Sequence, residues 1–185
     1  MSNSYAQPIL RTTDLAEAMR IIEQLLRIAD TTELEVDFES RVSSVPTLTA
    51  LMELLGDADW WAEGDRGGSS GEGDEPSKHL PIRLQSWARP PDIVEPLLKA
   101  TGKAPAAVRW DFSGWPEAPD VGLGVGGSRG AFVTLVVNAR DLDLDEPATD
   151  HTLFVHVKQV EAARAPWLAA QVGLRVIGDL VMAPH

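Results

Sequence analysis

The sequence contains no cysteine, a single tyrosine, and only 16 lysine and arginine residues against 28 aspartate and glutamate residues. Without cysteine, the chain forms no disulfide bond and offers no thiolate to a metal ion or a substrate. The shortage of basic residues argues against nucleic acid as a partner, because lysine and arginine are needed to neutralise phosphates. The same shortage opposes docking on an anionic membrane surface. We therefore expect neither nucleic acid nor a membrane as a partner.

Long apolar runs are also missing, since no stretch approaches the roughly 20 apolar residues that span a bilayer. Residues 1–8 lack the basic and apolar regions of a signal peptide, so we expect a cytoplasmic protein. The 185 residues, 44% of them apolar, are enough to bury one substantial core. We therefore predict a single domain over residues 1–185, with a mobile loop rich in glycine, serine and acid at about 62–79.

Hydrophobic periodicity predicts an α+β fold. Residues 14–29 carry one continuous apolar stripe at helical spacing, and Asp14 with Glu17 has the form of a capping box. Apolar residues at 34, 36 and 38 alternate with the acids Glu33, Glu35, Asp37 and Glu39, which predicts a strand with the acids on its solvent-facing side. The order of elements favours a mixed or mainly antiparallel sheet of about five to six strands packed with three to four helices. The further helices are expected at 46–55, 91–101 and 162–172, and the further strands at 82–86, 108–112, 131–138, 153–157 and 174–181.

Two short segments hold almost all of the net charge of −12. Residues 57–76 contain seven acids and one base, and residues 141–150 contain five acids and no base. The first segment includes Trp60 and Trp61. Neighbouring residues of an extended chain face opposite ways, so one indole is expected to pack inward and the other to be presented outward. Two simpler interpretations remain open: both indoles cover the core, and the acids serve only solubility.

Carboxylates that surround large aromatic side chains favour a surface that binds a basic protein, because charged rims steer association and buried tryptophans anchor interfaces. The residues predicted to bind this partner are Asp57, Asp59, Trp60, Trp61, Glu63, Asp65, Asp141, Asp143, Asp145 and Glu146.

Two glycine motifs match catalytic or cofactor patterns by spacing but not by context. Gly122, Gly124 and Gly127 satisfy G-x-G-x-x-G, yet an apolar strand follows them where a dinucleotide fold needs a helix. Residues 126–130 satisfy G-x-S-x-G, but Ser128 also precedes a strand, which predicts a hairpin turn and not a nucleophile elbow. A small serine hydrolase that uses Ser128 with His151 or His156 stays as the catalytic alternative.

The candidate metal-binding motifs lack residues that the metal sites require. The run Asp141-x-Asp143-x-Asp145 begins like a calcium loop, but Glu146 stands where the turn needs glycine and Thr152 where a bidentate acid is needed. No two histidines have the helical spacing of a zinc site, and two that are five apart, His151 and His156, would face opposite sides of one strand. We therefore expect no metal, no cofactor and no catalytic residue.

The chain is small, acidic, free of cysteine and rich in tryptophan, with an α+β pattern and a glycine-rich, hairpin-like stretch over residues 121–137 (VGLGVGGSRGAFVTLVV). In these respects it resembles the immunity proteins of bacterial toxin systems. The resemblance implies a bacterial protein that binds and blocks a cognate toxin, often a basic nuclease or deaminase. The leading hypothesis is a non-enzymatic binding protein that masks a basic protein partner. An accessory or structural module is the third alternative, and the oligomeric state is left open.

Overall fold

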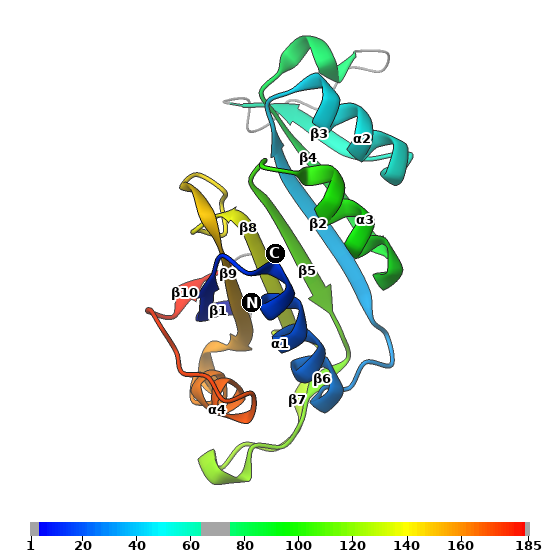
Figure 1. The fold of residues 1–185 in the computed structure, drawn as a ribbon. Coiled ribbons are helices and arrows are strands. Elements are labelled where there is room, and N and C mark those ends of the chain that lie inside the picture. The colour runs from blue at the N-terminus through cyan, green and yellow to red at the C-terminus, as the bar shows by residue number, and fades with distance from the viewer. Residues whose placement is uncertain (1–3, 64–74, 184–185) are drawn as a thin grey trace.

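A computed structural model describes residues 4–63 and 75–183, and its main feature is an eight-stranded antiparallel sheet (Figure 1). Its strands are β1 (Ser4–Thr12), β2 (Glu35–Val42), β3 (Asp59–Ala62), β4 (Ile82–Arg89), β5 (Ala106–Asp111), β8 (Phe132–Ala139), β9 (Pro147–Lys158) and β10 (Val181–Met182). They lie in the order β10-β1-β9-β8-β5-β2-β4-β3. A separate small hairpin joins β6 (Gly114–Trp115) to β7 (Gly126–Gly127). The α+β class and the antiparallel sheet are confirmed, whereas the predicted five to six strands were too few.

The helices form where their capping residues predict. Within the described residues they are α1 (Leu15–Ile28), α2 (Val45–Leu55), α3 (Val94–Thr101) and α4 (Arg164–Gln171). The Asp14 carboxylate accepts hydrogen bonds from the backbone N–H groups of Ala16, at 2.9 Å, and Glu17, at 3.3 Å, which caps α1. Gly56 and Gly102 end α2 and α3 with φ of 71° and 58°, values that other residues rarely adopt.

The helices α1, α2 and α3 lie over one face of the sheet, and α2 packs beside α3 (Figure 1). The main core lies between these layers. It is built from the apolar residues that each strand turns toward the helices, among them Phe38, Val108, Leu135 and Val155. Helix α4 adds Leu168 to the same core. Because one face of the sheet supplies this core, the other face is available for different chemistry.

A smaller apolar cluster lies on the opposite face of the sheet. Val136 and Phe154 meet Leu144 of the loop between β8 and β9, together with Ala6 and Ala183 from the first and last described strand regions. Leu144 has 0% exposed surface and a φ of 59°, so the loop folds down onto the sheet instead of extending into solvent. We call this loop, residues 140–146, the acidic loop, and the sheet face on which it lies the open face.

Three strands differ from the sequence prediction. Strand β1 was not predicted, because residues 4–12 are polar at their start and contain Pro8. Pro8 is tolerated because β10 pairs only with Tyr5 and Ala6, so at Pro8 no strand requires the missing N–H. The register with β9 shifts just after it.

The predicted strand over 174–181 is wrong, since only Val181 and Met182 pair with β1 and the preceding residues form no strand. Gly178 packs against the Pro8 ring, which cannot extend the ladder. Strand β3 was described only as an extended acidic segment. Of the loop predicted at 62–79, Ala62 ends β3, Glu63 and Glu75 form ion pairs, and Pro76–His79 forms a 3₁₀ turn. The rest of the prediction, residues 64–74, falls outside the described residues.

Candidate functional site: the open face of the sheet

The two faces of β2 separate apolar from charged side chains, as its alternating sequence predicts. Val36, Phe38 and Val42 point into the main core. Glu35, Asp37, Glu39 and Arg41 alternate with them and therefore lie on the open face. Antiparallel pairing then places residues of neighbouring strands side by side in rows across the sheet.

The open-face rows around β2 mix acids with arginines. Glu39 stands between Gln85 of β4 and Ala107 of β5, and Arg41 stands opposite Arg83. In the next rows toward the other end of β2, Asp37 stands opposite Arg109 and Glu35 opposite Asp111.

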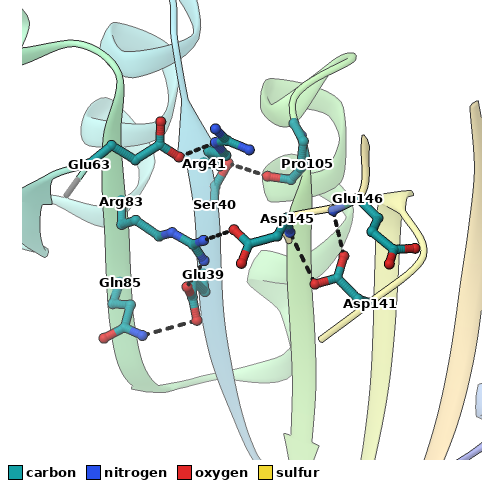
Figure 2. A network of polar contacts seen from close by, with 10 residues as sticks. All are labelled: Glu39, Ser40, Arg41, Glu63, Arg83, Gln85, Pro105, Asp141, Asp145 and Glu146. Atoms are coloured by element: carbon teal, nitrogen blue, oxygen red, sulfur yellow. Dashed lines mark hydrogen bonds and ion pairs between the residues drawn. The ribbon is translucent and has the colours of Figure 1, made fainter. Parts of the chain in front are cut away.

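The structure brings acids from both acidic segments of the sequence onto this same face: Asp59 and Glu63 of the first segment, and the acidic loop of the second. Strand β3 places Asp59 opposite Gln85 and Trp61 opposite Arg83. The acidic loop lies over the same face, where Asp145 reaches Arg83 while Glu63, just after β3, pairs with Arg41 (Figure 2). The Arg83 guanidinium donates to Glu39 Oε1 at 3.0 Å and to Asp145 Oδ1 at 2.8 Å. A single arginine therefore joins the sheet to a loop that lies about 60 residues further along the chain.

The adjacent tryptophans face opposite ways, which confirms the alternation predicted for them. Trp60 packs against the main core on the helix side, with its ring centroid 5.4 Å from that of His79. Trp61, opposite Arg83, belongs to the open face and is half-buried. Only Trp61 of the pair is therefore placed beside the acids of the open face.

Two of the predicted acids, Asp57 and Asp141, are already held by other groups of the chain. Asp57 lies at the end of α2 and pairs with Arg89 at 2.8 Å, and this hydrogen-bonded ion pair lowers the pKa of Asp57 below its ordinary value. Asp141 shapes its own loop, because its carboxylate accepts from the backbone N–H groups of Asp145 and Glu146, at 3.1 and 2.7 Å. Asp65 lies outside the described residues.

The arginines were missed by sequence reasoning, which counted charges segment by segment. On the open face Arg41 pairs with Glu63, Arg83 with Glu39 and Asp145, and Arg109 with Asp37. Each arginine is separated in sequence from its acid by tens of residues, so no local pattern reveals the pairing.

The acids still outnumber the bases where acids of both segments lie. We define the acidic face as the open-face residues of β2 to β5 together with Glu63 and residues 141–146 of the acidic loop; Arg140, at the start of that loop, pairs instead with Asp150 of β9. The acidic face contains three arginines, Arg41, Arg83 and Arg109, and these ten acids: Glu35, Asp37, Glu39, Asp59, Glu63, Asp111, Asp141, Asp143, Asp145 and Glu146. The three arginines engage only four of these acids, and the other six form no ion pair with any residue that the structure describes.

Two directly opposed carboxylates mark one end of the acidic face. Asp111 faces Glu35 across the β5–β2 ladder, an arrangement in which like charges repel. The pKa of Asp111 is raised to about 6, chiefly by burial and also by the charges of Asp37 and Glu35, while Arg109 opposes the shift. This end of the sheet therefore lacks one compensating cation.

A groove of about 410 Å³ crosses the open face between the strands and the acidic loop. Its lining includes Asp37, Glu39, Trp87, Arg109 and Asp143, together with the apolar Leu142 and Met182. The Arg109 guanidinium lies 5.0 Å from the Phe132 ring centroid and 5.9 Å from that of Trp87. Asp37 holds this arginine and also accepts from the backbone N–H of Ala88, at 2.9 Å, where β4 bulges. Trp87 itself is 47% exposed.

The two histidines of the catalytic alternative lie on opposite faces of β9. His156 is buried under the groove, with Nε2 2.8 Å from Thr134 Oγ1. His151 faces the helix side, where its Nδ1 accepts from the Asn138 N–H at 3.3 Å, and burial lowers its pKa. Ser128 lies in a turn between β7 and β8. These two strands belong to different sheets and do not pair, so the predicted hairpin turn at Ser128 is wrong.

The glycine-rich segment packs around a buried arginine. Arg164 has 1% exposed surface and donates to the carbonyl oxygens of Pro116 and Gly124 and to Glu161. A Cβ atom at Gly126 would lie 3.3 Å from this guanidinium, so the glycine allows the close approach. Gly126 belongs to the G-x-S-x-G match, and the Gly124 carbonyl of the G-x-G-x-x-G match is an acceptor for Arg164.

In the part of the chain that the structure describes, no three or more histidine, aspartate or glutamate side chains form a group that could hold a metal ion. Over the same residues, no helix combines the length and the apolar character needed to cross a membrane.

Comparisons of the chain with protein-family models, with curated proteins and with solved structures find no match.

Proposed function

We propose that the protein is a non-enzymatic binding protein that uses its own acidic face to mask a basic protein partner. It would act as an immunity-type inhibitor of a bacterial toxin. The observation that carries the proposal is the presence of acids from both acidic segments on one sheet face, where ten acids surround three arginines. The arginines already have acidic partners, so the remaining carboxylates are available to a basic surface.

The inhibition would be steric and electrostatic. Carboxylates of the acidic face steer the partner and pair with lysine and arginine residues around its active cleft. Trp61 is placed among these acids and supplies an aromatic anchor that loses water on binding. The resemblance to immunity proteins suggests the kind of partner, a toxin whose own substrate is acidic.

Charge reversal tests the proposal. A basic partner is first isolated at low salt from a lysate of the producing cell, identified and purified. Binding is then measured with Asp59, Asp143 and Glu146 all changed to lysine, three exposed residues of the acidic face without an ion pair to a described residue. We expect the dissociation constant to rise by about tenfold or more, mainly through slower association that no longer depends steeply on salt.

The matched control reverses three exposed acids on the helix side, Glu53, Asp92 and Glu95, and changes the net charge by the same amount. We expect this control to bind within about twofold of the unaltered protein. Equal losses in the two variants would show that only net charge matters. A partner that is harmless when expressed alone, or that stays active when co-expressed with this protein, would contradict the inhibitor role.

A further inference from the structure

The lining of the groove combines apolar with charged side chains. Leu142 of the acidic loop and Met182 of β10 contribute apolar surface. Asp37, Glu39 and Asp143 supply carboxylates, and Arg109 supplies a single positive charge. With these four groups charged, the lining has a net charge of −2, so it favours a cation over an anion.

The floor of the groove is hollow because β5 has a small side chain there. Ala107 stands in the row between Glu39 and Val136 and is only half-buried, although it lies near the middle of an eight-stranded sheet. Two positions further along the same face of β5, the rings of Trp87 and Phe132 pack against Arg109 and fill the space there. The small side chain of Ala107 therefore leaves part of the groove unfilled.

Arg109 already pairs with one of the three acids of the groove, so it is not free to neutralise the other two. Arg109 is bound to Asp37 and lies close to two aromatic rings. Glu39 accepts from Arg83 and, at 3.0 Å, from Gln85. Asp143 is exposed and has no ion pair with a described residue, although it stands at the mouth of the groove.

We propose that the groove receives one long basic side chain, an arginine or a lysine, from the surface of the partner. Its aliphatic stem would lie along Leu142 and Met182, and its charged end would reach Asp143 and Glu39, since such side chains bury their stems on apolar surface while the charge stays hydrated. This inference rests on the proposed function and names the subsite at which a basic partner would be anchored.

Filling the groove without altering a charge tests the subsite. The Ala107→Leu variant occupies the hollow, and the matched control, Ala16→Leu, adds the same atoms at an exposed position of α1. We expect Ala107→Leu to raise the dissociation constant of the basic partner by about tenfold, mainly through faster dissociation, and Ala16→Leu to leave it within about twofold. Equal stability of both variants in urea would exclude misfolding as the cause.

A small probe separates the subsite from the wider acidic face. N-acetyl-arginine amide is titrated into the ¹⁵N-labelled protein, with N-acetyl-glutamine amide as the neutral control. We expect the arginine probe alone to shift the signals of Ala107 and of the Trp87 indole N–H. These shifts should be lost in Ala107→Leu and weakened in Asp143→Asn.

The outcomes distinguish the two proposals. If Ala107→Leu leaves partner binding intact while charge reversal of the acidic face abolishes it, the subsite is wrong and the proposed function stands. If the arginine probe binds in the groove but no basic protein binds the acidic face, the proposed function is wrong. Equal shifts with the glutamine probe, or shifts that survive Ala107→Leu, would overturn the basic side-chain subsite.

Discussion

The two faces of β2 have different roles, since one builds the apolar core and the other carries charged side chains. On the helix side, Phe38 and Val42 are buried in a continuous apolar core, and even the buried Ser40 is satisfied by donating to the Pro105 carbonyl at 3.0 Å. On the open side, Asp37 and Glu39 are half-buried and engage arginines from the neighbouring strands. Apolar burial on one face stabilises the fold, so the other face is free to carry a dense pattern of charge.

The largest expected difference in the free energy of unfolding is between two single-residue variants of β2, one on each face. Phe38→Ala should lower the free energy of unfolding by about 3–5 kcal/mol, because it leaves a cavity in the core. Glu35→Ala on the open face of the same strand should change it by about 0.5 kcal/mol or less, since Glu35 is exposed and has no ion pair with a described residue. Urea denaturation of both variants measures the difference. Similar losses would show that the open face contributes to folding as much as the core does.

The second prediction compares how much a buried arginine and an exposed arginine contribute to stability. Arg164 is buried below the β6–β7 hairpin, whereas the side chain of Arg140, paired with Asp150, is 53% exposed. Arg164→Met should destabilise the protein by about 3 kcal/mol, because the carbonyl oxygens of Pro116 and Gly124 and the Glu161 carboxylate lose their donor.

Arg140→Met is the control and should cost about 0.5 kcal/mol or less, since exposed ion pairs contribute little. Thermal unfolding monitored by circular dichroism would rank the two variants. A tolerated Arg164→Met would mean that the hairpin does not depend on this arginine.

The smallest expected effect has the opposite sign. Because the pKa of Asp111 is raised to about 6 in the folded protein, its ionised form is disfavoured there relative to the unfolded chain. Its contribution to stability is therefore present below the unfolded pKa, near 4, and is lost as the pH rises through about 6. Asp111→Asn should stabilise the protein at pH 7 by about 1 kcal/mol, a figure reduced to allow for solvent screening of this half-exposed group.

The check is the unfolding free energy measured in urea from pH 4 to pH 7. The stability gain of Asp111→Asn should shrink toward pH 4, where the carboxyl group of the unaltered protein is protonated in the folded state. Glu35→Gln removes one of the repelling neighbours and should produce a smaller gain in the same direction. A destabilised Asp111→Asn would show that the carboxylate has a favourable role on the open face.

Local signals in the sequence were enough for much of this architecture. The apolar stripe and Asp14 predicted α1 to within one residue at each end, and glycines predicted the ends of the other helices. The alternation in β2 predicted which of its faces carries acid, and the adjacency of Trp60 and Trp61 predicted that they separate. Each of these signals depends only on residues close together in the chain.

What the sequence did not reveal depends on distant residues. Strand β1 is polar at its start and is defined by its pairing with β9, more than a hundred residues away. The same is true of the acidic face, where Arg83 meets Asp145 only because the acidic loop folds down on Leu144. A count of charge along the chain found the acids but not the arginines that pair with them, nor the groove over Ala107.

The position of β1 in the sheet has a consequence for how the protein is made. Its hydrogen-bonding partners are β9 and β10, both from the C-terminal part of the sequence. Strand β1 must therefore wait until the more than one hundred residues that separate it from β9 have followed it from the ribosome, while β2, β4 and β5 can pair early. Slow closure of this long-range pairing would set the pace of folding, and the apolar side of β1 would stay exposed to chaperones until then.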